Sequence, residues 1–294
     1  MSSLQQLGSR ELIVVTGKGG VGKSSVAAAL GVVMARGGRR VLVLEIDPRE
    51  SVHQMLAAPP SDGDILEVAP DLYLQNLQPR QVLDQVVRER LRWQAIFQRV
   101  LENPIYQHFT EAAPGLKEMA ILGHCLLLVE GRVPGAAKFD TVILDAPATG
   151  HGVSLLAAPL LVADVIRQGP IAHMTAEVAV FVSSPDRSGV VVVTLAEEMP
   201  VSEAIELRQL MDERLDRQPD LLVINALYPP VSAEAVEQSA DPLTALWIQR
   251  RGLNERELVR LDEVWSGSRL ELPLLPVGPG PALTEALAAR MERA

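Results

Sequence analysis

A glycine-rich segment with two lysines is the part of the chain best suited to chemistry. Residues 17–24 read GKGGVGKS and satisfy the phosphate-loop pattern G-x-x-x-x-G-K-[ST]. A β-branched run at 12–16 precedes the segment and a helical pattern opens at Lys23, which is the context that the pattern requires. Glycines allow backbone N–H groups to turn toward phosphate oxygens without a clash at Cβ. We therefore predict a site for the phosphates of ATP.

Each polar group of this loop has a predicted role in binding ATP and Mg²⁺. Lys23 is expected to reach the β- and γ-phosphates, and the hydroxyl of Ser24 to ligate Mg²⁺. Lys18 adds a second cation that could stabilise transition-state charge as an arginine finger does, the alternative being a solvated loop lysine. The residues predicted to contact ATP are Gly19, Gly20, Val21, Gly22, Lys23, Ser24 and Ser25.

The sequence KGGVGKS is a deviant form of the phosphate loop. It resembles the loop of the SIMIBI class of ATPases, in which the first lysine reaches across a dimer to the nucleotide of the partner. The resemblance implies that the chain acts as a homodimer and that Lys18 joins Lys23 in catalysis.

Two further motifs narrow the resemblance. Asp47-Pro48 follows the apolar run at 41–44, and DAPATGH at 145–151 follows the run at 141–144. Together with the deviant loop they resemble the ArsA family, which includes arsenite-pump ATPases and ATPases that deliver tail-anchored membrane proteins. The first switch of that family begins with Asp-Pro, and its second switch is close to DTAPTGH. The resemblance spans about residues 11–290, is weak across 60–110 and includes the segment 193–203.

The resemblance implies roles for two carboxylates. Asp47 corresponds to the catalytic residue that orients or activates the attacking water, a task that suits a carboxylate beside the γ-phosphate. A helix N-cap is the alternative role of Asp47. Asp145 corresponds to the aspartate that holds Mg²⁺ through water, as Asp47 is also expected to do. The alternative role of Asp145 is that of a structural turn residue.

The resemblance also assigns a second switch and a base pocket. The residues of the second switch that follow Asp145 are Thr149, Gly150 and His151. They would report the state of the γ-phosphate to neighbouring helices, although a structural histidine fits position 151 equally well. Asn225 matches an adenine-reading asparagine, whose amide can pair with the edge of the base. Pro276 and Val277 are expected to line the base pocket.

The chain also departs from the family. Its one cysteine, Cys125, can form neither an intramolecular disulfide nor the Cys-x-x-Cys zinc site that many tail-anchored-protein ATPases carry at the dimer seam. Arsenite-pump members are expected to use several thiolates, and a lone cysteine in an apolar helix is a poor site. Glu45 stands where the family often has a small hydroxyl residue. We therefore predict neither zinc nor arsenite binding.

The strands that must position these residues alternate with helices. Apolar runs without polar alternation predict strands that are covered on both faces. The predicted strands lie at 12–16, 41–44, 71–77, 141–144, 190–194, 221–224 and 270–275. This order predicts an α/β fold with a doubly wound, mainly parallel sheet flanked by helices, as in P-loop NTPases. We expect one domain over 1–294, with a mostly helical insertion at 79–135.

Two helical segments of the predicted insertion could also serve as contact surfaces. The helix at about 114–130 is apolar almost all round, so it is either buried or covers a client or subunit surface, and burial is the preferred interpretation. The other segment carries helix-spaced apolar residues over 82–101. In the functional interpretation, nucleotide-driven rearrangement of the dimer changes the exposure of both.

Composition excludes several classes of protein. With 48% apolar residues the chain is not disordered, and a net charge of −10 argues against a nucleic-acid partner held by a general basic surface. The apolar stretches at 119–129 and 150–163 fall short of the roughly 18 residues that span a bilayer. A secretory signal is not evident, so we expect a cytoplasmic protein. Leu283, Leu287 and Met291 predict a packed terminal helix in preference to a membrane anchor.

These features favour a homodimeric, Mg-ATP-dependent ATPase that switches conformation to act on an unidentified protein client or membrane component. A ParA/MinD-like positioning ATPase is an alternative that would show a basic face. A metalloid-pump ATPase subunit would need further thiolates. A non-catalytic nucleotide-dependent regulator would have lost Lys23, Ser24 or Asp47, and all three are present.

Overall fold

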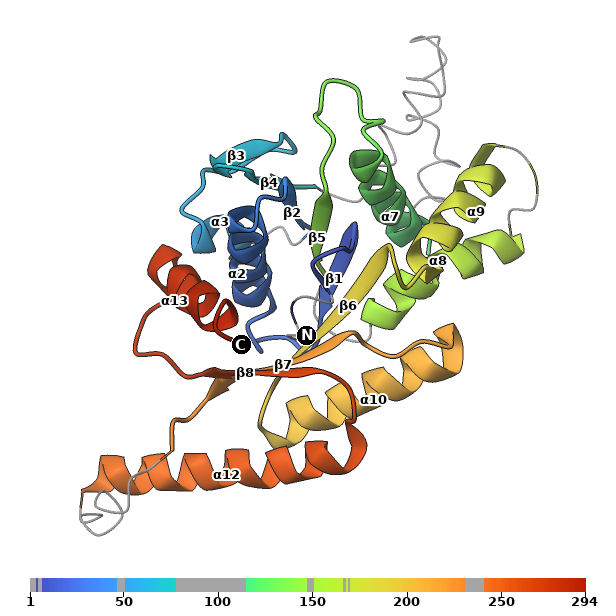
Figure 1. The fold of residues 1–294 in the computed structure, drawn as a ribbon. Helices are drawn as coiled ribbons and strands as arrows, with labels where there is room; N and C mark the ends of the chain where they lie inside the picture. The colour runs from blue at the N-terminus through green and yellow to red at the C-terminus, as the bar shows by residue number, and fades with distance from the viewer. Residues whose placement is uncertain are drawn as a thin grey trace, which may run out of the picture.

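An eight-stranded sheet forms the centre of the computed structural model, with helices on both of its faces (Figure 1). The structure describes residues 4, 7–46, 51–77, 115–146, 151–165, 168, 170–230 and 241–294. The predicted positions Asp47, Thr149 and Gly150 and the segment 79–114 lie outside these residues. The extent of the predicted insertion at 79–135 therefore stays a prediction.

The sheet is parallel except at one edge. Its strands are β1 (Leu12–Thr16), β2 (Val41–Glu45), β3 (Leu66–Ala69), β4 (Leu72–Asn76), β5 (Thr141–Asp145), β6 (Ser188–Leu195), β7 (Leu221–Leu227) and β8 (Arg269–Pro273). The spatial order is β3-β4-β2-β5-β1-β6-β7-β8, and only β3 runs antiparallel to its neighbour β4. This order confirms the predicted α/β fold with a doubly wound, mainly parallel sheet.

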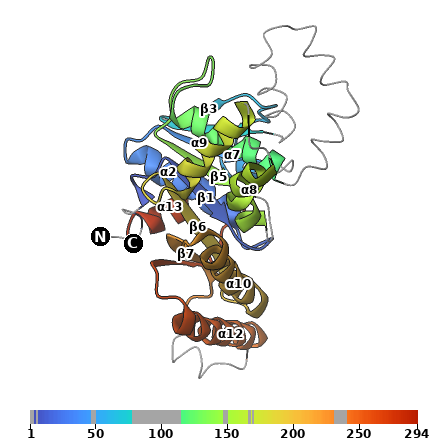
Figure 2. The ribbon, with the colours of Figure 1, turned by 90° about the vertical axis from the view of Figure 1, so that its right-hand side faces the viewer.

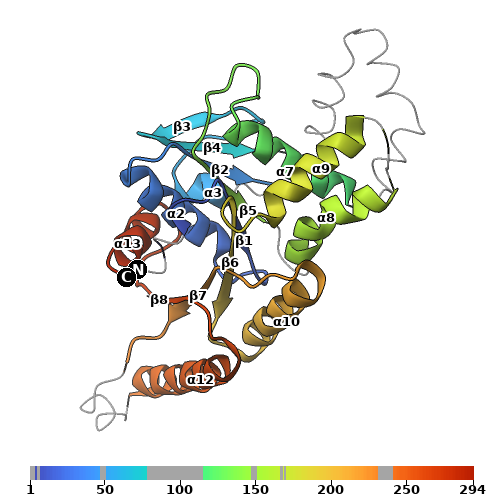
Figure 3. The same ribbon diagram turned by 45° about the vertical axis from the view of Figure 1, so that its right-hand side comes forward.

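The helices form two layers, one on each face of the sheet (Figures 2 and 3). Their bounds are α2 (Lys23–Arg36), α3 (Ser51–Met55), α7 (Leu116–Val129), α8 (His151–Val165), α9 (Pro170–Ser183), α10 (Glu198–Leu215), α12 (Pro242–Val264) and α13 (Pro281–Met291). Helices α2, α3 and α13 cover one face, and α7, α8, α9 and α10 cover the other. Helix α12 lies outside α10 in all three views.

Alternation along each strand divides the core between these layers. In β1, Leu12 and Val14 belong to the core on the side of α7, whereas Ile13 and Val15 belong to the core on the side of α2. All four side chains are fully buried. A run such as LIVV is therefore what a strand between two helical layers requires, because each face of it contacts apolar side chains.

Two helices, α13 at the end of the chain and α7, are expected from the sequence to bury their apolar side chains. Leu287 and Met291 of α13 are buried against α2, which confirms the packed terminal helix. Leu122, Cys125 and Leu126 of α7 are buried, which agrees with the preferred interpretation of that helix. None of the described helices combines the length and apolar character needed to cross a membrane.

Strand pairing brings the predicted site to one edge of the sheet. Strand β1 lies between β5 and β6, with Val15 opposite Asp145. Strand β5 also pairs with β2, with Glu45 opposite Asp145. Because the carboxyl ends of parallel strands meet at one edge, the phosphate loop, Asp145 and Glu45 at the end of β2 are neighbours there.

Candidate active site

The phosphate loop connects β1 to α2 in a backbone path that needs glycine. Gly17, Gly20 and Gly22 have φ angles of +142°, +84° and +92°. A Cβ at Gly17 would lie 2.1 Å from the carbonyl oxygen of Val193 in β6. A Cβ at Gly22 would lie 2.3 Å from Nδ2 of Asn225 in β7. The loop is thus pressed against two neighbouring strands, and larger side chains are excluded at both contacts.

Lys23 is the first residue of α2 and lies under this loop. Its side chain is buried, and Nζ donates a hydrogen bond of 3.0 Å to the backbone oxygen of Lys18. Gly22 precedes the helix and contributes no side-chain cap. The beginning of α2 therefore combines backbone N–H groups, the positive end of the helix dipole and an ammonium group, which together suit an anion.

Ser24 and Asp145 meet directly beside Lys23. The Ser24 hydroxyl donates a hydrogen bond of 2.6 Å to Oδ2 of Asp145, which is the last residue of β5 and is 4% exposed. A hydroxyl and a carboxylate at the end of a P-loop are oxygen donors of the type that Mg²⁺ binds. The residues present therefore fit the predicted magnesium site.

Asn225 extends the site along the sheet edge. It lies near the end of β7, and its Nδ2 donates a hydrogen bond of 2.9 Å to the backbone oxygen of Val21. This bond uses one N–H of the amide and leaves Oδ1 and the second N–H as further hydrogen-bonding groups. Pro276 and Val277 lie beyond β8 and are exposed. No described contact joins these two residues to Asn225, so the base pocket stays a prediction.

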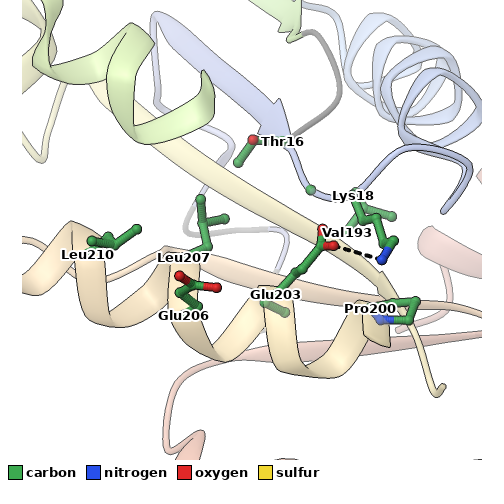
Figure 4. Close-up of a pocket in the computed structure, with 10 residues that line it drawn as sticks. Thr16, Lys18, Val193, Pro200, Glu203, Glu206, Leu207 and Leu210 are labelled. Carbon is green, nitrogen blue, oxygen red and sulfur yellow. Dashed lines mark hydrogen bonds and ion pairs between the residues drawn. The ribbon is translucent and has the colours of Figure 1, made fainter. Parts of the chain in front are cut away.

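Lys18 forms an ion pair within its own chain. Its Nζ lies 2.7 Å from Oε1 of Glu203 in α10, and the two side chains are 26% and 35% exposed. The pair borders a cavity of about 280 Å³ between the start of the loop and α10 (Figure 4). The Lys18 ammonium is therefore partly shielded from water and points toward α10.

A second carboxylate with a partner lies at the end of β2. Glu45 is fully buried and accepts hydrogen bonds of 3.0 Å from the backbone N–H of Val52 and from Nδ1 of His53. Burial raises the pKa of Glu45, an effect that these hydrogen bonds oppose. Glu45 and Val52 flank residues 47–50, so the carboxylate ties together the two sides of the segment that carries Asp47.

The structure thus brings together Lys18, Lys23, Ser24, Asp145 and Asn225 at one edge of the sheet. Asp47, Thr149 and Gly150 lie outside the described residues, and His151 begins α8 with a side chain that is not described.

Sequence reasoning missed the roles of Glu203 and His53. For Glu203 the order of the elements places the helix after β6 beside the loop after β1, but it does not select which carboxylate of that helix faces the loop. For His53 the indication in the sequence was Glu45, a carboxylate directly after the apolar run at 41–44 that would need a partner if buried.

Cys125 lies away from this site. It is fully buried in α7, and burial raises the pKa of its thiol to about 12. A thiol of this kind is neutral and a poor metal or metalloid ligand at neutral pH. Among the described residues, no group of three or more His, Cys, Asp or Glu side chains is arranged to hold a metal ion.

Comparison with known proteins agrees with this geometry. ATPase BagA of Mycobacterium tuberculosis is 30% identical over 214 residues, which cover 66% of this chain and 59% of that protein. The arsenical pump-driving ATPase of Acidiphilium multivorum is 27% identical over 296 residues, which cover 94% of this chain and 49% of that protein. The chain thus spans about half to three fifths of the length of these relatives. The profile of the family described as anion-transporting ATPase matches residues 10–178, and the chain belongs to this family.

Proposed function

We propose that the chain hydrolyses ATP with Mg²⁺ as a homodimer, and that hydrolysis switches its conformation to act on a protein client or membrane component. The observation that carries the proposal is the assembly of Lys23, Ser24 and Asp145 at the loop between β1 and α2, with Ser24 and Asp145 2.6 Å apart. Family membership supports the same reaction.

The phosphates of ATP would lie at the beginning of α2. Lys23 donates to the Lys18 backbone oxygen within the loop, and on binding of ATP its ammonium would turn to phosphate oxygens held by the loop N–H groups. Ser24 and Asp145 would hold Mg²⁺, which when bound neutralises charge on the β- and γ-phosphates. Asn225 would orient the adenine while it supports the loop through Val21.

Asp47 would serve as the base or water-orienting group. The attacking water gives its proton to the Asp47 carboxylate and bonds to the γ-phosphorus, while the bond from phosphorus to the β–γ bridging oxygen breaks. The products are ADP and inorganic phosphate. The position of β2 supports this role, because its last residue, Glu45, pairs with Asp145 in the sheet register.

We also propose that the cargo is not arsenite, although some relatives are named arsenical pump-driving ATPases. The buried thiol of Cys125, with its pKa raised to about 12, supports this view. Arsenite binding through cysteine would need thiolates that can reach the ion together.

Phosphate-release measurements test the proposed function. We expect Mg²⁺-dependent turnover of ATP that Lys23→Ala abolishes together with ATP binding, measured by calorimetry. Lys138→Ala replaces an exposed lysine remote from the loop and is the matched control. Asp47→Asn is expected to keep ATP binding and to lower turnover by at least about 100-fold, the lower range for loss of a general base. Retention of ATP binding by Lys23→Ala would contradict the phosphate-loop assignment.

A further inference from the structure

Glu203 places the side chain of Lys18 on the surface of α10. The ammonium lies 2.7 Å from Oε1 of Glu203, and both side chains are partly shielded from water. Figure 4 shows Glu203 on the side of α10 that faces the loop, with the ion pair at one end of the cavity. Lys18 is thus held by a group that is 185 positions later in the sequence.

The surrounding fold holds the phosphate loop and α10 in the positions that allow the contact between Lys18 and Glu203. Gly17 is pressed against the backbone oxygen of Val193 in β6, which fixes where the loop leaves β1. Helix α10 follows β6 after a short connection, and its residues Pro200, Ala204 and Leu207 line the apolar wall of the cavity. The strand that holds the loop thus also leads into the helix that supplies the carboxylate.

The Lys18 ammonium is engaged by the Glu203 carboxylate, which therefore competes with a phosphate of another protomer for the same cation. We propose that Glu203 is a positioning residue that holds Lys18 on its own protomer, and that Lys18 leaves Glu203 when a second copy of the chain brings its bound ATP within reach. The inference rests on the proposed function, in which Lys18 acts across a homodimer. The inference adds one step, the release of Lys18 from Glu203. This step opposes contact between Lys18 and the ATP site of the partner before ATP is brought within reach.

The Lys18–Glu203 ion pair is weak enough for Lys18 to leave it when a phosphate comes within reach. A pair that is about one-third exposed and partly screened is weak, so the more highly charged triphosphate can displace the carboxylate. Removing the pair is therefore expected to favour the dimer by about two- to fivefold for each protomer, or about 4- to 25-fold for the two pairs in a dimer.

The test compares Glu203→Gln with Glu206→Gln. Glu206 lines the same cavity one helical turn later, and no ion pair of Glu206 is found among the described residues, so it is a matched control. We expect Glu203→Gln to lower the protein concentration at which ATP turnover is half-maximal by about 4- to 25-fold. Glu206→Gln is expected to behave as the wild type. In a Lys18→Ala background, Glu203→Gln is expected to have no effect, because no cation remains to be held.

Nuclear magnetic resonance gives a readout that does not depend on turnover. The chain has only four lysines, Lys18, Lys23, Lys117 and Lys138, so lysine-selective labelling of the side chain yields four signals. The Lys18 signal is identified by its loss in Lys18→Ala. We expect Glu203→Gln, but not Glu206→Gln, to shift this signal, and ATP added to Asp47→Asn to shift it in the otherwise unmodified chain.

The outcomes separate this inference from the proposed function. If turnover does not depend on protein concentration and Lys18→Ala is fully active, the cross-dimer function itself is wrong. If both of those expectations hold but Glu203→Gln matches the wild type or needs a higher protein concentration, Glu203 does not restrain Lys18. An equal effect of Glu203→Gln in the presence and absence of Lys18 would also overturn the inference.

Discussion

Glu45 and His53 form a buried hydrogen bond of 3.0 Å between the end of β2 and α3. The two side chains are 0% and 3% exposed. Nε2 of His53 has no hydrogen-bond partner among the described residues, so the ring is held through Nδ1. The bond joins the two sides of residues 47–50.

We expect Glu45→Ala to lower the free energy of unfolding by about 1–3 kcal/mol, because the buried N–H groups of Val52 and His53 lose their acceptor. Urea unfolding followed by circular dichroism measures the loss. Glu67→Ala replaces an exposed carboxylate on β3 and is expected to stay within about 0.5 kcal/mol of the wild type. Equal stability of the two variants would show that the buried bond contributes nothing.

Glu45→Gln keeps the side-chain shape and one acceptor oxygen, so it tests position more than stability. We expect turnover to fall about tenfold with little change in the KM for ATP, because the end of β2 leads into the segment that carries Asp47. Steady-state kinetics separate the two parameters. A change in KM alone would place the effect of Glu45 in binding.

Asn225 has a structural contact in addition to its predicted contact with adenine. Asn225→Ala removes the hydrogen bond to Val21 as well as the amide that would meet the base. We expect affinity for tripolyphosphate, which lacks a base, to fall a fewfold and affinity for ATP to fall about tenfold, the size of one or two hydrogen bonds. Calorimetry with both ligands measures the two effects. Equal losses of affinity for ATP and tripolyphosphate would show that Asn225 supports the loop and does not contact the base.

Much of the site could be predicted because its residues are adjacent in sequence or lie at strand ends. The loop from Gly17 to Ser24 identifies itself by spacing, and the apolar run at 141–144 places Asp145 at the edge of a parallel sheet. The Lys18–Glu203 pair could not be predicted in the same way. It depends on which carboxylate of α10 faces the loop, and Glu203 and Glu206 are indistinguishable in the sequence.

The missed strand β3 shows a second limit. Its four residues, Leu66–Ala69, alternate in exposure and pair only with β4 at the edge of the sheet. A short, half-exposed edge strand has a weak hydrophobic signal, and its pairing depends on the turn at Asp71, where φ is +59°. Backbone pairing with β4 therefore defines this strand more than its local composition does.

Ser24→Ala tests the magnesium assignment. The variant removes the hydroxyl that contacts Asp145 at 2.6 Å and would ligate the ion. We expect affinity for ATP without Mg²⁺ to stay within about twofold, and the gain in affinity on adding Mg²⁺ to be lost, because the loop and Lys23 are unchanged. Ser202→Ala removes a hydroxyl bonded within α10 and is the control. A normal response of Ser24→Ala to Mg²⁺ would remove Ser24 from the ligand set.

The buried side chain of His124 is expected to make the stability of the fold depend on pH. It is buried in α7 with Nε2 3.2 Å from Oε1 of Gln75, whose amide in turn donates to Gly63. Burial lowers the pKa of His124 to about 4, below its ordinary value of 6.5. The unfolded chain therefore binds a proton that the folded chain does not bind between these two values, and stability falls as pH falls through this window.

From about pH 7.5 to about pH 5 this single group is expected to cost the wild type about 2 kcal/mol of unfolding free energy. His124→Gln keeps a neutral donor toward Gln75 but does not titrate, so its stability is expected to fall by that much less over the same range. Urea unfolding at both pH values measures the difference. His173→Gln replaces an exposed histidine of α9 and is expected to follow the wild type. If His124→Gln and the wild type lose the same stability, the His124 ring is protonated in the folded chain as readily as in the unfolded one.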